Sequence, residues 1–208
     1  FRLTEEDQIF ETEPKETWID QEIGTVVRFE GLRAGAYREN FSRQPATLQV
    51  YFAAQFIADF LSGGSAPISL SAKTEKGKVT DLRYPDDVSD LVVLGPTKLN
   101  DINVQKLGDF SVTAYLCDGK ASRGLDGRHQ VHLLGNSRTV ETRKVDDLIG
   151  ISSISHDGVD NLSLHLVVSS SFLDERTFES RTSFSVPESD LSAVVKAAVQ
   201  SAREEFIS

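Results

Sequence analysis

The chain has 208 residues, a formal net charge of −10 and a hydrophobic share of 39%. This length can bury a full hydrophobic core, and we expect one compact domain. No apolar run approaches the roughly 20 residues that cross a bilayer as a helix, which argues against a transmembrane helix and leaves peripheral membrane association open. The acidic balance argues against a dedicated nucleic-acid binder, because attraction between cationic side chains and phosphates supplies most nonspecific affinity.

The usage of cysteine and methionine narrows the class of protein further. Cys117 is the single cysteine, so the chain forms no intramolecular disulfide and no zinc site with several cysteines. Methionine is absent and the first residue is Phe1, which is therefore not a translation start. We interpret the chain as the mature form of an exported or organelle-targeted protein, or as a trimmed cytoplasmic chain.

The first 22 residues carry much of the negative charge. They hold eight acidic side chains against Arg2 and Lys15, a net charge of −6. Such a segment is typical of a solvated extension, yet Phe10 and Trp18 are apolar anchors that could contact a partner protein or the chain's own domain. We predict an acidic extension over residues 1–22, with these two aromatic residues as contacts, and a single α+β domain over residues 23–208.

The first half of this domain combines strands with one buried helix. A strand is expected at residues 23–29. Residues 48–61 are apolar nearly all round, which predicts a buried helix that ends at Ser62-Gly63-Gly64. Residues 68–72 and 79–84 alternate on either side of a polar turn, which predicts an antiparallel hairpin.

Four further strands are expected in the middle of the chain. They are residues 91–94, 110–117, 131–134 and 149–154. Turn-forming dipeptides bound them, among them Gly135-Asn136 and Asp157-Gly158.

The last fifty residues show the clearest periodicity. Alternation from Leu162 to Phe172, a polar turn at residues 174–176 and renewed alternation over residues 178–186 predict a half-buried antiparallel strand pair. Pro187 stops the second strand, and the Ser189-Asp190 region offers oxygens that could cap a helix. The helix then presents one apolar face, made of Leu191, Val194, Val195, Ala198, Ala202 and Phe206.

Together these elements predict an α+β fold. A mostly antiparallel β-sheet is expected to pack against the early buried helix and the long C-terminal amphipathic helix.

The sequence carries no recognised catalytic motif. It has no glycine-rich phosphate-binding loop and no G-x-S-x-G turn that would expose a nucleophilic serine. Cys117, His129 and His132 are weak candidates for metal ligands. Residues three apart on a strand point to opposite faces, which disfavours joint ligation by the two histidines. We therefore expect no catalytic residues, no metal and no cofactor.

A cationic strip between residues 119 and 144 is the strongest candidate for a binding surface. Its local charge is +4, because two acidic residues, Asp126 and Glu141, stand against six basic ones. Such a strip can bind an anion or an acidic protein segment. The six basic residues of the cationic strip are Lys120, Arg123, Arg128, Arg138, Arg143 and Lys144.

Charge segregation without a catalytic motif favours a non-catalytic binding or assembly subunit, an accessory protein with a protein partner in a larger complex. Two alternatives stay open. One is a carrier of a small apolar ligand in a cavity between helix and sheet, which is a fold-level analogy. The other is a metal-assisted hydrolase that uses His129, His132 or Cys117.

Overall fold

A computed structural model describes residues 53, 56–62, 68–73, 79–84, 86–120, 125–178 and 183–207. All of them belong to the second of two units into which the chain divides, residues 42–208. The predicted extension over residues 1–22, with Phe10 and Trp18, lies outside the described residues, as does the predicted strand at residues 23–29.

The described residues form strands, short helices and one long helix. The strands are β1 (Ile68–Lys73), β2 (Val79–Tyr84), β3 (Val92–Lys98), β4 (Ile102–Val104), β5 (Gly108–Asp118), β6 (Gln130–Gly135), β7 (Arg138–Lys144), β8 (Ile154–His156) and β9 (Val159–Ser169). The helices are α3 (Asp86–Ser89), α4 (Asp146–Ile149), α5 (Ser171–Glu175) and α6 (Glu188–Phe206), and residues 56–62 are also helical.

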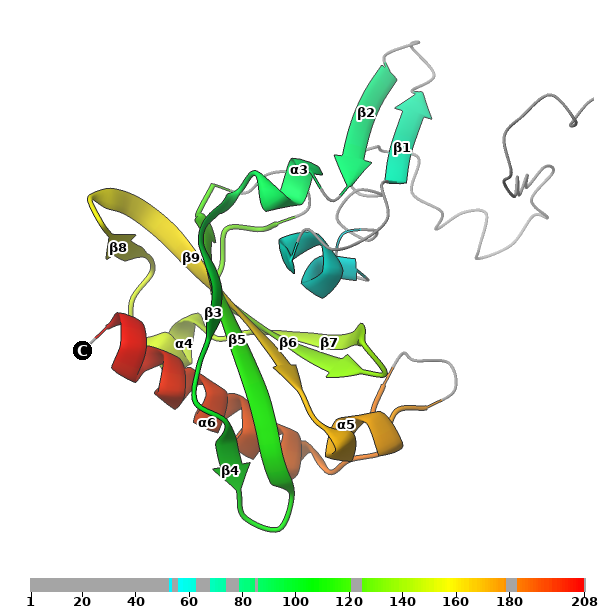
Figure 1. Ribbon diagram of the computed structural model, residues 1–208, viewed down its shortest axis with the longest axis vertical. Coiled ribbons are helices and arrows are strands. Elements are labelled where there is room, and N and C mark those ends of the chain that lie inside the picture. The colour runs from blue at the N-terminus through cyan, green and yellow to red at the C-terminus, as the bar shows by residue number, and fades with distance from the viewer. Residues whose placement is uncertain are drawn as a thin grey trace, which may run out of the picture. The chain divides into compact units, whose positions relative to one another are not determined.

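Seven strands form one mixed sheet in the order β3-β5-β9-β6-β7, with β4 paired to β5 and β8 paired to β9 (Figure 1). All pairs are antiparallel except β6 and β9, which run parallel with Val131 opposite Leu166. The predicted α+β class with a mostly antiparallel sheet is confirmed. The strands predicted at residues 91–94, 110–117 and 131–134 correspond to β3, β5 and β6.

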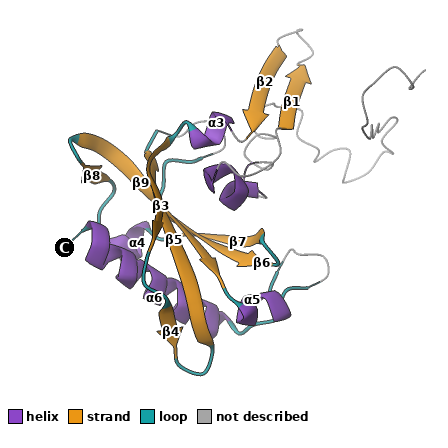
Figure 2. Cartoon of the chain, in the orientation of Figure 1, coloured by secondary structure: helices purple, strands orange, loops and turns teal. Residues whose placement is uncertain are grey.

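The main hydrophobic core lies between this sheet and α6, which runs along one face of the sheet (Figure 2). The predicted apolar helix face is confirmed, since Leu191, Val194 and Val195 are among its buried residues and Phe206 packs at the edge of the core. The predicted cap is wrong, because α6 begins at Glu188 and Pro187 occupies the N-cap position without a side-chain hydrogen bond. None of the described helices combines the length and apolarity needed to cross a membrane.

A second, smaller apolar layer covers part of the opposite face of the sheet. The helical residues Ile57 and Phe60 pack there with Tyr115 and Cys117 of β5. The sequence predicts β9 to be half buried, which is wrong for its middle, because Ser163 and His165 are 1% and 0% exposed. This strand is central in the sheet and is covered on both faces over that stretch. The predicted helix at residues 48–61 extends beyond the described residues, so its length stays a prediction.

The predicted return strand over residues 178–186 is wrong for the described part of that range, which forms no strand beside β9. The five-residue helix α5 follows β9 directly, because the Ser170 hydroxyl accepts a hydrogen bond from the backbone N–H of Leu173 and Leu173 itself is fully buried. After α5 the chain forms one isolated bridge, between Thr177 and Phe184, and residues 179–182 are not described.

Residues 149–154 are another misassigned strand. Residues 146–149 form α4, which ends at Gly150 in the left-handed conformation with φ = 82°. Only at Ile154 does a strand, β8, begin. It turns through Asp157 and Gly158, both at positive φ, into β9, so the predicted Asp-Gly turn is confirmed.

Two antiparallel hairpins are formed by β1 with β2 and by β6 with β7. The predicted pairing of residues 68–72 with 79–84 is confirmed, since β1 and β2 pair antiparallel from Ile68 opposite Tyr84 to Lys73 opposite Val79. The strand β7 was not predicted. It pairs with β6 through a two-residue turn in which Asn136 and Ser137 have positive φ.

Candidate functional site

The cationic strip folds into β7 and the segments before β6, and acidic side chains neutralise much of it. Lys144 of β7 contacts Asp126 at 2.8 Å, and Arg128 lies 3.8 Å from Asp146. Arg138 lies over the ring of Phe56, with its guanidinium carbon 5.8 Å from the ring centroid. Lys120 is exposed and Arg123 is not described. The net charge of the strip therefore overstates the charge available to a partner.

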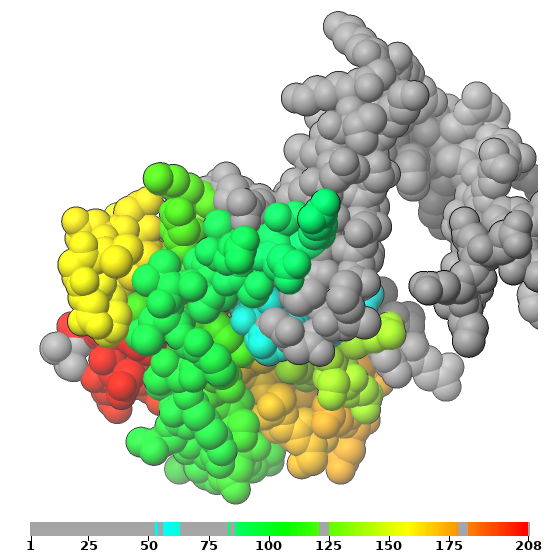
Figure 3. All heavy atoms as spheres, turned by 45° about the horizontal axis from the view of Figure 1, so that its top comes forward, coloured from blue at the N-terminus to red at the C-terminus, as the bar shows by residue number. Residues whose placement is uncertain are grey.

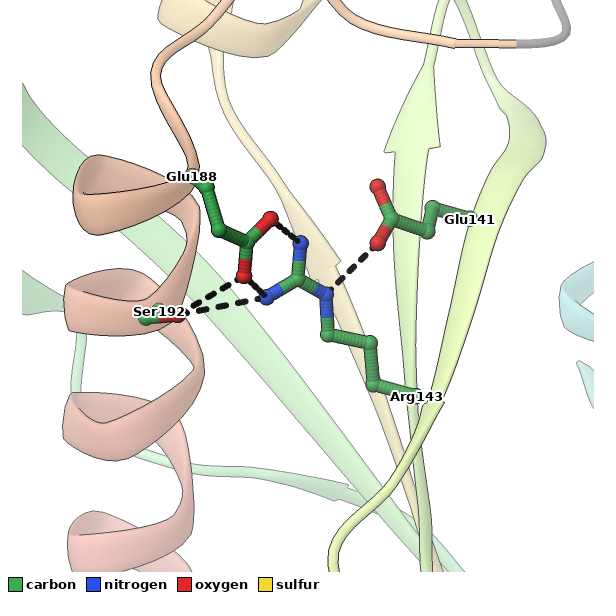
Figure 4. A network of polar contacts seen from close by, with 4 residues as sticks. All are labelled: Glu141, Arg143, Glu188 and Ser192. Atoms are coloured by element: carbon green, nitrogen blue, oxygen red, sulfur yellow. Dashed lines mark hydrogen bonds and ion pairs between the residues drawn. The ribbon is translucent and has the colours of Figure 1, made fainter.

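Arg143 is the most strongly held cation of the strip (Figure 4). Its guanidinium donates to both carboxylate oxygens of Glu188 at 2.7 and 2.9 Å and to Glu141 at 2.6 Å. Burial alone would lower the pKa of Arg143, but these hydrogen bonds raise it overall. The same contact lowers the pKa of the exposed Glu188 carboxylate. Arg143 thus fastens the start of α6 to β7 by a bidentate pair.

A shallow groove of about 280 Å³ lies beside this ion pair, between the end of β7, α4 and α6. Its apolar part is formed by Val145, Leu148 and Val195, of which Leu148 is 36% exposed. The polar residues that line the groove are Arg143, Lys144, Ser192 and Lys196. Lys196 has no acidic partner among the described side chains. The sequence places Lys196 on the outer face of the C-terminal helix, but nothing in its spacing indicates that it joins the strip.

A second polar cluster is buried on the face of the sheet opposite α6. The rings of His132 and His165 are parallel within 7°, and Nε2 of His132 lies 3.0 Å from Nδ1 of His165. The other ring nitrogens contact the hydroxyls of Thr142, at 3.0 Å from His132, and of Ser163, at 3.3 Å from His165. Two adjacent strands of a parallel pair, β6 and β9, bring these side chains together.

One arrangement of protons satisfies all of these contacts together with the hydrogen bond from Ser163 to the backbone. The Ser163 hydroxyl donates to the Cys117 carbonyl and so accepts from Nε2 of His165. Nδ1 of His165 then accepts from Nε2 of His132, whose Nδ1 accepts from the Thr142 hydroxyl. Both rings are neutral in this chain, and every lone pair of their ring nitrogens is occupied. As arranged, neither ring has a nitrogen free to bind a metal.

His129 and His132 do not act together. His129 lies just before β6, and its Nδ1 accepts the backbone N–H of Leu164 at 2.9 Å. Burial lowers the pKa of His129, while Asp146 and the Ile151 carbonyl oppose that shift. Its Nε2 is buried without hydrogen-bond geometry to any described atom. Within the described part of the chain, no three histidine, cysteine or acidic side chains are grouped so as to hold a metal ion.

Cys117 is a buried thiol. It is 0% exposed in β5, and burial raises the pKa of its thiol to about 12. The reactive thiolate is therefore scarce at neutral pH.

We expect native protein at pH 8 to react with a thiol reagent such as 5,5′-dithiobis(2-nitrobenzoic acid) at least about 100-fold more slowly than protein unfolded in urea, because both burial and the raised pKa suppress attack. The absorbance of the released aromatic thiol measures both rates. Comparable rates would contradict the buried position of Cys117.

Comparison of the chain with protein-family models, curated proteins and solved structures finds no match.

Proposed function

We propose that this protein is a non-catalytic binding subunit that uses the groove between β7, α4 and α6 to bind an acidic segment of a partner protein. The observation that carries the proposal is the combination of an apolar groove floor with a cationic rim. Neutral or basic segments lack the charge that this rim would attract.

The groove offers a partner two kinds of contact, one apolar and one charged. Leu148 is exposed and Val195 lies beneath the surface, so one apolar side chain of a partner could lose water against them. Lys144 and Lys196 flank that position. The Lys144 pair with Asp126 is exposed, with 64% of the lysine side chain accessible, and such pairs contribute little stability. A partner carboxylate can therefore compete for Lys144.

The alternatives from the sequence receive less support from the described residues. The layer between α6 and the sheet, where an apolar carrier would hold its ligand, is occupied by large side chains such as Leu116, Leu133 and Leu166. A metal-assisted hydrolase would use His129, His132 or Cys117. Both ring nitrogens of His132 are hydrogen-bonded, and His129 and Cys117 are fully buried, so a substrate would not reach them. The predicted contacts Phe10 and Trp18 stay a proposal for a second contact region.

The test is a titration of the full chain into a fluorescent peptide of glutamates around a central phenylalanine, followed by fluorescence anisotropy. We expect saturable binding that weakens as salt is added, because exposed charges are screened. The double variant Lys144→Glu/Lys196→Glu should lower the affinity about tenfold or more, since it reverses both rim charges. Leu148→Ser should lower the affinity as well, and this loss should depend less on salt than the loss in the double variant.

Lys98→Glu/Lys106→Glu is the matched control, because these two exposed lysines do not line the groove and their reversal changes the net charge by the same amount as the double variant. Equal losses in this variant and in the double variant would show that net charge alone governs binding, which would overturn the proposal. Binding of phosphatidylserine vesicles without binding of the peptide would overturn it too. The far-ultraviolet circular dichroism of each variant confirms that it is folded.

A further inference from the structure

A second surface site, unrelated to the groove, lies where β5, β6 and β9 meet α5. It is a pocket of about 470 Å³, within the range of about 300–1,000 Å³ that small-molecule sites occupy. In Figure 3, gold and orange atoms of the segment that holds the end of β9 and α5 lie beside green and lime atoms of earlier strands. The lining residues are Asp109, Ser111, Leu134, Ser137, Ser169, Ser170, Ser171 and Asp174.

The topology explains why the serines converge. Ser111 of β5 and Ser169 of β9 are directly opposite each other in the antiparallel pair. Their neighbours Val112 and Val168 are fully buried in the core beneath α6, so alternation along the strands turns Ser111 and Ser169 to the other face. The β6–β7 turn and α5 add hydroxyls from two further segments. No local sequence spacing joins these positions.

The carboxylates of this pocket are each held by one oxygen only. Asp174 accepts the backbone N–H of Asn136 at 2.6 Å through Oδ1, and Asp109 accepts the side-chain amide of Asn103 at 2.6 Å, also through Oδ1. Within the described part of the chain, Oδ2 of either residue accepts no hydrogen bond. Both carboxylates are therefore positioned in advance and keep one free acceptor.

Some of the serine hydroxyls in the pocket are hydrogen-bonded within the chain, and others are not. Ser111 donates to Asp101 at 3.0 Å, and Ser170 accepts from the backbone of Leu173. The hydroxyls of Ser137, Ser169 and Ser171 have no hydrogen-bond partner among the described residues. The pocket thus offers free acceptors on its carboxylates, groups that both donate and accept on its serines, and one half-buried apolar side chain, Leu134.

We propose that this pocket binds a neutral polyhydroxylated ligand of the sugar or polyol class. A ligand hydroxyl can donate to a carboxylate and accept from a serine at once, which matches both kinds of free group. An anion would be repelled by Asp109 and Asp174. An apolar ligand would displace water from two carboxylates without replacing the hydrogen bonds that the water makes, and this desolvation costs free energy. The C–H face of a sugar ring fits against Leu134.

The test is a nuclear magnetic resonance titration of the full ¹⁵N-labelled chain with maltose, sucrose, trehalose and myo-inositol, each up to tens of millimolar. We expect at least one of these probes to shift the amide signals of Ser169, Ser170 and Ser171 in a saturable way. Ser169→Ala and Ser171→Ala should each weaken that binding by about three- to tenfold, the loss expected for one hydrogen bond.

Ser189→Ala is the matched control, because Ser189 is an exposed serine in the first turn of α6 and lies outside the pocket. Titrations with sodium phosphate and calcium chloride cover the two ionic alternatives. Three results would overturn the proposal: no shift at the pocket with any of the four probes, equal weakening by Ser189→Ala, or saturable shifts with phosphate or calcium alone. None of these bears on the groove.

Discussion

Replacing Leu166 by alanine is expected to lower the free energy of unfolding by roughly 2–5 kcal/mol, the range for buried leucines whose cavity does not collapse. Leu166 is fully buried in β9, the central strand, with Ala114 of β5 on one side and Val131 of β6 on the other. Neighbours on two strands and α6 hold the surrounding atoms in place, so little relaxation is expected. Urea unfolding followed by circular dichroism measures the change.

Val159→Ala serves as the control, since Val159 begins the same strand and is 42% exposed. Exposed substitutions usually change stability by less than about 0.5 kcal/mol. If Leu166→Ala cost no more than Val159→Ala, the central position of β9 would be wrong. A change in the slope of the denaturation curve would indicate that the variant alters the unfolded or native ensemble as well.

The elements that the sequence predicts well are those whose signal is local. The apolar face of α6 recurs with the helical period, and the hairpin of β1 and β2 alternates around a polar turn, so neither needs information from elsewhere in the chain. The sequence does not predict α5, because its signal is not a local period. Its five residues are too few for a helical period, and what decides them is the Ser170 cap and the burial of Leu173.

Strand faces depend on what covers them, which the local pattern does not contain. The polar positions Ser163 and His165 alternate with leucines, a pattern typical of a solvent-exposed face. They are buried because a second apolar layer, with Ile57 and Phe60, comes from residues about a hundred positions earlier. The sequence does not predict β7, because its charges at residues 138, 141, 143 and 144 indicate a binding strip. Its β-branched residues, which favour a strand, stand between these charges.

The same limit applies to the candidate sites. Counting charges between residues 119 and 144 indicates a candidate region, but it cannot predict that Glu188, 45 positions beyond Arg143, pairs with the Arg143 guanidinium. Pairing across the sheet also creates the contact between His132 and His165, 33 positions apart. Both contacts join elements that are distant in the sequence: the packing of α6 brings Glu188 to Arg143, and the parallel pairing of β6 with β9 brings the two histidines together.

That histidine contact predicts a marked loss of stability in mild acid. Burial lowers the pKa of His165 to about 4, and burial together with the neighbouring His165 lowers the pKa of His132 well below its usual value of about 6.5. Below pH 6.5 the unfolded chain binds protons that the folded chain does not. The free energy of unfolding therefore falls as the pH drops from about 6.5 to about 4, and it is restored above pH 6.5.

The expected loss in the free energy of unfolding follows from the pKa shift of His165. One pKa unit corresponds to about 1.4 kcal/mol, so His165 alone should cost about 3 kcal/mol between pH 6.5 and pH 4, with His132 adding in the same direction. Carboxylates also titrate near the lower end of this window. The informative measurement is therefore the difference between urea-unfolding profiles of the wild type and of His165→Gln across pH 4–8.

His165→Gln keeps a neutral hydrogen-bonding side chain beside Ser163 but cannot take up a proton in either state. It should flatten the fall of stability between pH 6.5 and pH 4, even if it lowers stability equally at every pH. His156→Gln is the control, because it removes a histidine whose side chain is 36% exposed and which lies outside the buried pair, and the flattening should be specific to His165→Gln. Parallel profiles for the wild type and His165→Gln would mean that the buried pair already binds a proton in the folded chain. The neutral hydrogen-bond chain from Thr142 to Ser163 would then be wrong.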